Sequence, residues 1–456
     1  MAGPRNLVSD RRAWLENALP RLLRRERVAL FIGYLLVQGV IVAGLTTPRY
    51  PDSGGYLQLS FIGRYDRPWT VPLLYTIFPT DSLRIAAQVV LAAASWWFLA
   101  NAASRLVRDR YVRLGVRVVL LMLGVVGPVA SWNSTILSDS AAISLTALLI
   151  GCWIRHASRP SRTTALSLLA VTLLWSFTRN DLILVGAGIT VCAVVAVTWR
   201  WRSRVNALLA CGLIVISAYG LAVDNRNPYI LDENIASVIE GRILDNPGWR
   251  QWFIAHGMPY SVGVQDTQGG LYGLALLQIP VFHVWLTASG ASTYAEFLLE
   301  HPAYTLLDPL PDFSGELASI NWPNRTAYAY TQPNPSPSML SPTANYGRHR
   351  DILPSVIQDL LFQQGQIGDV LLLAVGAFGL AWVARRKLGS DSRMWVPFIA
   401  IAFAIAQGYL VWFAGDAEID RHAIVLATTA RIGLWIVAGY ALDRLIQTRQ
   451  TRAPAH

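Results

Sequence analysis

The sequence predicts an all-α polytopic membrane protein with about ten transmembrane helices, a first outer amphipathic loop and one large outer segment. Of its 456 residues, 53% are hydrophobic and only 14% are charged, which is too apolar for a soluble protein of this length. Apolar stretches of about 17 to 25 residues, enough to cross a bilayer, recur along the chain. The ten predicted spans are 28–46, 83–104, 115–130, 138–154, 163–178, 182–199, 205–223, 367–384, 395–414 and 422–443.

The distribution of basic residues predicts the orientation. Most of the 38 Lys and Arg residues fall in alternate connections, which are Arg5–Arg27, Arg105–Arg117, Arg155–Arg162, Arg200–Arg204, Arg385–Arg393 and the tail from Arg444. Because Lys and Arg accumulate in cytoplasmic loops, we expect a protein of the cytoplasmic membrane with both termini in the cytoplasm. The spread of these cations over six short connections argues against a nucleic-acid partner and favours contact with membrane lipids.

These spans divide the chain into five predicted parts. They are a cytoplasmic basic tail (1–27), an N-terminal membrane module of about seven helices (28–223), a large outer segment (224–366), a C-terminal module of about three helices (367–443) and a cytoplasmic tail (444–456). The outer segment is polar and rich in proline, and it is the one candidate for a separate domain. Its stretch from Pro302 to Pro342 is typical of a long irregular loop, either a substrate lid or disordered chain.

The first outer loop, 47–82, contains the candidate catalytic base. Asp52 stands in the stretch YPDSGGYLQLS, where two glycines allow a tight turn and Tyr56 suits a membrane interface. A carboxylate held at the outer surface can accept a proton, but Asp52 is equally a good cap for a short helix. Further along this loop, Arg67 stands among interfacial aromatic residues.

Two further outer turns contain charged residues. Asp139 comes where the chain re-enters the bilayer, so it is either a second catalytic acid or part of an ordinary helix cap formed by Ser138 or Asp139. Arg179 and Asp181 share the turn between the fifth and sixth predicted spans. They either satisfy each other or leave the arginine to bind a phosphate.

The last outer connection is the second concentration of charge. Glu418, Arg421 and His422 come directly before the final span. Mutual ion pairing and capping of the helix dipole are one explanation, which suits Glu418 better than Arg421 and His422. Cations at the start of a helix are disfavoured unless an anion is present, so the other explanation is an anionic ligand. Arg431 falls deep within the final span, where it must pair or line a polar cavity.

This order of residues resembles the GT-C superfamily of membrane glycosyltransferases. The resemblance lies in Asp52 after the first span, Asp139 by the fourth span and the Arg421–His422 pair before the last, and it covers 28–223 and 367–443. It implies transfer of a sugar from a polyprenyl-phosphate donor to an envelope glycan, lipid or protein acceptor on the outer side.

By the same resemblance, Asp52 is the base and Arg421 or Arg179 holds the donor phosphate. The residues expected around the substrate are His422, Glu418, Arg67 and Tyr56. The family often places a second acid beside the first-loop aspartate, where this chain has Ser53. Use of a divalent metal therefore stays open, and no residue is assigned as a metal ligand.

Two other functional classes fit a chain of this kind, a transporter or lipid flippase and a non-catalytic envelope scaffold. Transporters usually place their binding charges near the bilayer midplane, often between repeated halves. Here the charged residues gather at the outer ends of the predicted spans, with Arg431 as the exception. The pattern therefore favours the glycosyltransferase.

Overall fold

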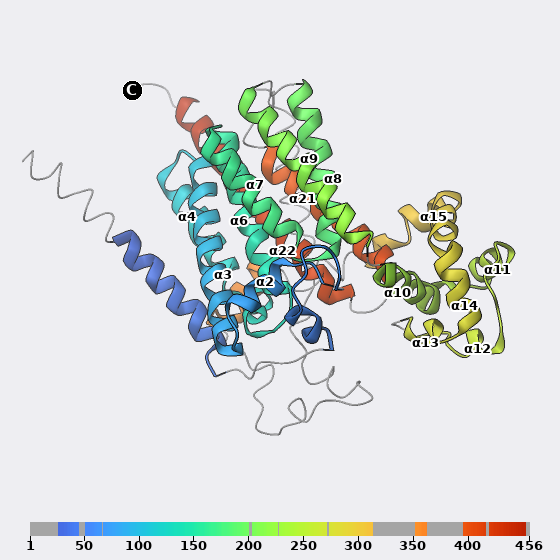
Figure 1. Cartoon of the computed structure of the whole chain (residues 1–456). Coiled ribbons are helices and arrows are strands. Elements are labelled where there is room, and N and C mark those ends of the chain that lie inside the picture. The colour runs from blue at the N-terminus through green and yellow to red at the C-terminus, as the bar shows by residue number, and fades with distance from the viewer. Residues whose placement is uncertain are drawn as a thin grey trace, which may run out of the picture.

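The computed structural model is helical and contains no strand in the residues that it describes. These are 26–44, 51–65, 67–199, 203–226, 228–270, 273–312, 352–362, 395–415 and 419–452. Long helices form a bundle, and a group of shorter helices lies beside it (Figure 1). The predicted all-α class is confirmed for this part of the chain.

Six helices are long and apolar enough to cross a membrane. The candidate spans lie in α3 (Asp81–Ala103), α6 (Asp139–Ser158), α8 (Asn180–Trp199), α9 (Arg204–Asp224), α21 (Trp395–Ala414) and α22 (Ile419–Arg452). Within the described residues, one further pair of segments, α4 (Arg110–Leu123) and Gly127–Ser134, adds a seventh span if the two are counted together. The protein is therefore a multi-pass membrane protein.

The predicted number of ten spans is not confirmed. α7 (Arg162–Ser176), with 15 residues, is shorter than a span requires, and the described helix 26–42 is not among the candidate spans. The predicted span 367–384 lies outside the described residues. The predicted span 115–130 is interrupted by a bend of 54°. Pro128 explains the bend, because proline lacks the N–H of a continuing helix and starts the short helix α5 (Gly127–Ala130).

Neighbouring helices of the bundle run parallel in one pair, α3 and α6, and antiparallel in two others, α8 with α9 and α21 with α22. α3 lies against α6, α8 against α9, and α21 against α22, while α6 and α22 are the most enclosed of the six candidate spans. Trp96 and Trp132 are fully buried in the central core. The apolar faces left outside this core suit contact with lipid.

The two ends of the bundle differ in character. At one end, the backbone N–H groups of Arg108 and Asp109 donate to Oδ1 of Asp443, at 3.0 and 2.7 Å, which joins a basic connection to the C-terminal part of α22. At the opposite end lie the 3₁₀-helix η1 (Pro51–Leu57) and α2 (Thr70–Ile77) (Figure 1). This separation agrees with the alternation in the sequence, and which end faces outward remains a prediction.

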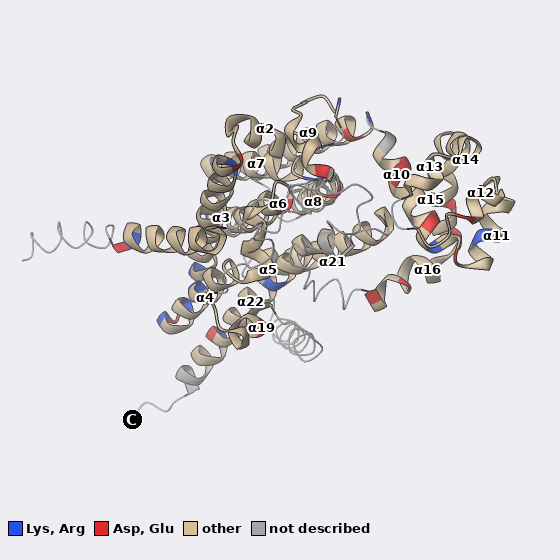
Figure 2. Ribbon diagram, turned by 90° about the horizontal axis from the view of Figure 1, so that it is seen from below, with Lys and Arg blue, Asp and Glu red and all other residues tan. Residues whose placement is uncertain are grey.

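The described part of the outer segment forms a helical unit, here called the outer unit (228–312). Its elements are α10 (Pro228–Val238), the π-helix η4 (Ile239–Ile243), α11 (Pro247–Ala255), α12 (Val262–Gln265), α13 (Leu274–Leu277), α14 (Pro280–Trp285), the π-helix η5 (Leu286–Gly290), α15 (Ala291–Glu300) and α16 (Pro302–Leu306). They enclose a separate apolar core around Phe253, Phe282 and Phe297. Trp412 of α21 packs into the same core, which attaches the unit to the bundle. Figure 2 shows the unit beside the bundle, with several acidic positions coloured red along its ribbon.

Arg431 has a structural role inside the bundle. Its side chain is fully buried in α22, where Nε donates to the carbonyl oxygen of Phe362 at 2.6 Å and Nη1 to that of Ala427 at 3.0 Å. The guanidinium also lies 4.0 Å from the centre of the Phe362 ring. Phe362 ends the helix α19 (Ser355–Phe362), so the cation satisfies the carbonyl end of that helix.

Candidate active site

Asp52 lies in the first turn of η1 and forms an ion pair with Arg67. Its Oδ1 is 2.9 Å from Nη2 of Arg67, and the two side chains are 26% and 27% exposed. The short helix considered for this stretch is therefore present, and the carboxylate also has a cationic partner. This carboxylate remains accessible to solvent.

Glycines explain how this loop is placed. A Cβ on Gly55 would lie 3.1 Å from Cγ of Arg67, so the absent side chain leaves room for the arginine stem. Gly63 has a φ of +73°, and a Cβ there would lie 2.5 Å from the carbonyl oxygen of Val223. The hydroxyl of Tyr219 donates to the carbonyl of Phe61 at 2.5 Å, which fixes the loop to the C-terminal end of α9.

Tyr56 connects this loop to the start of α6. The guanidinium of Arg67 lies 5.3 Å from the centre of the Tyr56 ring, and the buried Tyr56 hydroxyl lies 2.9 Å from Oγ of Ser138. The suggestion that Ser138 caps α6 is wrong, because its side chain makes no capping hydrogen bond. The hydroxyl instead lies against Tyr56, one residue before Asp139.

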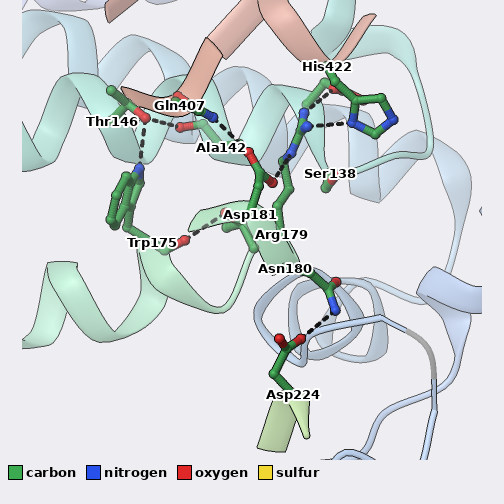
Figure 3. Close-up of polar contacts among 12 residues, drawn as sticks. Ser138, Ala142, Thr146, Trp175, Arg179, Asn180, Asp181, Asp224, Gln407 and His422 are labelled. Atoms are coloured by element: carbon green, nitrogen blue, oxygen red, sulfur yellow. Dashed lines mark hydrogen bonds and ion pairs between the residues drawn. The ribbon is translucent and has the colours of Figure 1, made fainter. Parts of the chain in front are cut away.

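Arg179 is the centre of a buried charge cluster, defined here as Asp139, Arg179, Asp181, Gln407 and His422. Nη1 of Arg179 is 3.1 Å from Oδ1 of Asp139, and Nε is 2.9 Å from Oδ1 of Asp181. Gln407 of α21 donates to the other oxygen of Asp181 at 2.7 Å (Figure 3). Burial by itself would lower the pKa of Arg179, but Asp181 and Asp139 outweigh it and hold that pKa above its usual value.

His422 extends the cluster to the start of α22. Its Nδ1 lies 2.5 Å from Nη2 of Arg179 (Figure 3). A guanidinium can only donate, so Nδ1 of His422 must accept and cannot carry a proton in this arrangement. The contact thus joins the α7–α8 turn to the last helix and specifies the protonation state of the imidazole.

A buried polar network fixes the residues that lead into α6. Nε2 of Gln88 donates to the carbonyl oxygens of Asn133 and Thr135, at 3.1 and 2.9 Å. The hydroxyl of Tyr75 donates to the carbonyl of Leu137 at 2.8 Å. Satisfying these buried carbonyls holds the segment rigid, and this places Asp139 against Arg179.

The structure brings six of the eight predicted site residues into one series, in which Ser138, the chain neighbour of Asp139, makes the link to Tyr56. In order along the series these are Asp52, Arg67, Tyr56, Asp139, Arg179 and His422. Glu418 and the side chain of Arg421 lie outside the described residues. The series runs from an accessible carboxylate to the first turn of α22.

The sequence suggested the pairing of Asp181 with Arg179, but no role was predicted for Gln407. Asp181 accepts hydrogen bonds from Arg179 and Gln407, and so connects α8 to α21. The sequence could have indicated a buried polar contact for Gln407, because it is a polar side chain inside the apolar span 395–414. Its partner could not be read from the sequence, since the two residues are far apart in the chain.

The described residues contain no group of three or more His, Cys, Asp or Glu side chains placed to hold a metal ion. No model of a known protein family matches the chain, and no curated protein matches it. The likeness to GT-C enzymes therefore rests on Asp52, Asp139 and the Arg421–His422 pair.

Proposed function

We propose that this protein is a membrane glycosyltransferase that moves a sugar from a polyprenyl-phosphate donor to a glycan, lipid or protein acceptor of the cell envelope, on the outer side of the cytoplasmic membrane. The observation that carries the proposal is the series of contacts from the accessible Asp52 to His422 at the start of α22. It unites an accessible carboxylate with cations at one end of the bundle.

In the proposed reaction, Asp52 removes the proton from the acceptor hydroxyl as its oxygen attacks the anomeric carbon of the donor. A new carbon–oxygen bond forms, and the bond to the phosphate oxygen breaks with its electron pair leaving on the polyprenyl phosphate. Arg67, 2.9 Å from Asp52, favours the ionised carboxylate, which is the form that accepts a proton.

The leaving phosphate needs positive charge, and Arg421 at the start of α22 is proposed to supply it, while the neutral His422 can donate one hydrogen bond from Nε2. Arg421 and His422 stand in the first turn of this helix, where the helix dipole also favours an anion. Arg179 is shared between Asp139 and Asp181, so we assign it the positioning of His422. This leaves Arg421 as the proposed direct ligand, because its fork matches two phosphate oxygens.

Transport is the second candidate function, and Arg431 was the residue that favoured it. A charge deep in a span is typical of a transport pathway. Arg431, however, donates to the carbonyls of Phe362 and Ala427, which gives that charge a structural explanation. Glycosyl transfer remains the function that accounts for the accessible acid.

The test replaces Asp52 by asparagine. Asp52→Asn keeps the shape and an acceptor oxygen but removes the base, so we expect transfer to fall by about 10²-fold or more. Purified variants would be assayed with a panel of polyprenyl-phosphate sugars, with donor binding and thermal stability measured in parallel.

Asp81→Asn is the matched control, because Asp81 also forms a partly exposed ion pair, with Arg84 at 2.8 Å. Asp139→Asn tests the other candidate acid. Wild-type turnover in Asp52→Asn would remove Asp52 as the base.

A further inference from the structure

A shallow, open cavity of about 420 Å³ lies where the outer unit meets the C-terminal end of α21. Trp412 of α21 forms one side, and residues of η4, α11 and α16 with their following turns form the rest. Its volume falls in the range of about 300 to 1,000 Å³ that is usual for small-molecule sites. The cavity is separate from the series of contacts that begins at Asp52.

The wall formed by α21 is held firmly in place. Nη1 of Arg242 donates to the carbonyl of Trp412 at 2.6 Å, and Nη2 donates to that of Gly415 at 3.2 Å. The guanidinium also lies 3.9 Å from the centre of the Trp412 ring, whose Nε1 donates to Asp312 at 2.9 Å. A wall fixed in this way reduces the entropy lost when a ligand binds.

The lining combines aromatic rings with hydrogen-bonding groups. Trp249 and Tyr304 lie with their ring centres 4.7 Å apart, and the carboxylates of Asp245 and Asp308 stand around them. The Tyr304 side chain is 2% exposed, and its hydroxyl makes no hydrogen bond of standard geometry although Arg242 and Tyr294 lie near it. The partly exposed ring of Trp249 suits the C–H face of a sugar ring, while the carboxylates suit its hydroxyls, and the buried Tyr304 supports Trp249 from behind.

The charge of this region selects against a phosphate. Three carboxylates line the cavity, from Asp245, Asp308 and Asp312, whereas Arg242 is the one cation and already contacts two carbonyls. The whole stretch 228–312 contains nine Asp or Glu residues and two Arg. Repulsion from these acids disfavours an anionic ligand such as the lipid phosphate donor.

We infer that this cavity binds a neutral oligosaccharide, which serves as the acceptor. The identification of the sugar as acceptor rests on the proposed function, whereas sugar binding itself does not. Trp412 and Gln407 stand on the same helix, five residues or about 7.5 Å apart along its axis, and Gln407 contacts the buried charge cluster. A docked glycan thus lies against the same helix that contacts the buried charge cluster.

The test is direct binding to the purified full chain in nanodiscs, by calorimetry. The probes are neutral gluco-, manno-, galacto- and arabino-oligosaccharides of two to six units, with choline and spermidine as cationic probes. We expect at least one oligosaccharide to bind, and Trp249→Leu and Asp308→Asn each to weaken it tenfold or more. Asp266→Asn, an exposed acid elsewhere on the outer unit, is the matched control and should leave affinity unchanged.

Asp52→Asn should also bind the sugar normally, so that loss of transfer and loss of acceptor binding are separate results. Thermal midpoints of all variants exclude misfolding as the cause of weaker binding. The inference is overturned if no neutral oligosaccharide binds, if only the amines bind, or if folded Trp249→Leu and Asp308→Asn both keep wild-type affinity.

Discussion

Two aspartate–arginine pairs at one end of the bundle have nearly the same geometry but different surroundings. Asp52 and Arg67 are 2.9 Å apart and about a quarter exposed, whereas Asp139 and Arg179 are 3.1 Å apart and at most 5% exposed. Solvent screens the first pair, so it contributes about 0 to 1 kcal/mol to stability. Removing one partner of the buried pair leaves a buried charge, which costs about 3 to 5 kcal/mol.

The exposure of the carboxylate decides which pair is suited to chemistry. A base must meet its substrate, and Asp52 can do so because its partner leaves it accessible. Asp139 is enclosed and joins α6 to the α7–α8 turn, so its ion pair with Arg179 serves the stability of the fold. The same residue types therefore serve different purposes according to burial.

The largest expected effect is that of Arg179→Met. The change leaves the carboxylates of Asp139 and Asp181 buried without their cation, so we expect a loss of about 3 to 5 kcal/mol of unfolding free energy. Thermal denaturation in detergent measures it, as a marked fall of the midpoint.

The triple variant Asp139→Asn, Arg179→Met, Asp181→Asn removes all three charges together. We expect it to recover much of the lost stability, because replacing a whole buried ion pair is far less damaging than removing one partner. A thermal midpoint for Arg179→Met equal to that of the wild type would contradict the prediction that the buried pair matters more for stability than the exposed pair.

The second expected effect concerns Glu240, a buried carboxylate bonded to a backbone N–H. Its Oε2 accepts from Gly273 at 2.7 Å, and burial raises the pKa of Glu240 above the usual 4.5 although that N–H acts against the shift. The folded protein thus holds this proton to a higher pH than the unfolded chain does. The unfolding free energy therefore falls as pH rises above 4.5.

Glu240→Gln removes that loss, since an amide does not titrate. We therefore expect the thermal midpoint of Glu240→Gln, minus that of the wild type, to increase as the pH is raised from 4.5 to about 7. Asp266→Asn serves as the exposed control. A constant difference between the two midpoints across this range would show that burial does not penalise the charge at Glu240.

The smallest expected effect on stability is that of Arg67→Met. The exposed pair with Asp52 contributes about 0 to 1 kcal/mol, and the methionine retains much of the apolar stem beside Gly55. The thermal midpoint should move little. A fall comparable with that of Arg179→Met would mean that the loop pair is as structural as the buried one.

Composition and charge alternation were enough to predict the helical class, the six candidate spans and the separation of the charged turns from the basic connection at Arg108–Asp109. The predicted span 163–178 is not confirmed, because α7 has only 15 residues. The local pairing of Arg179 with Asp181 could be suggested from two residues of the same turn. The contact of Gln407 with Asp181 could not, because hydropathy gives no information on which helices are neighbours.

The anchoring of Arg431 has a consequence for how the protein enters the membrane. A centrally placed arginine adds about 2.5 to 3.5 kcal/mol to the free energy of inserting a helix by itself. Its main acceptor, the carbonyl of Phe362, belongs to a part of the chain that the ribosome makes earlier. We therefore expect α22 to insert after the earlier helices have begun to assemble. The hydrogen bond from Arg431 to Phe362 can form only in that order.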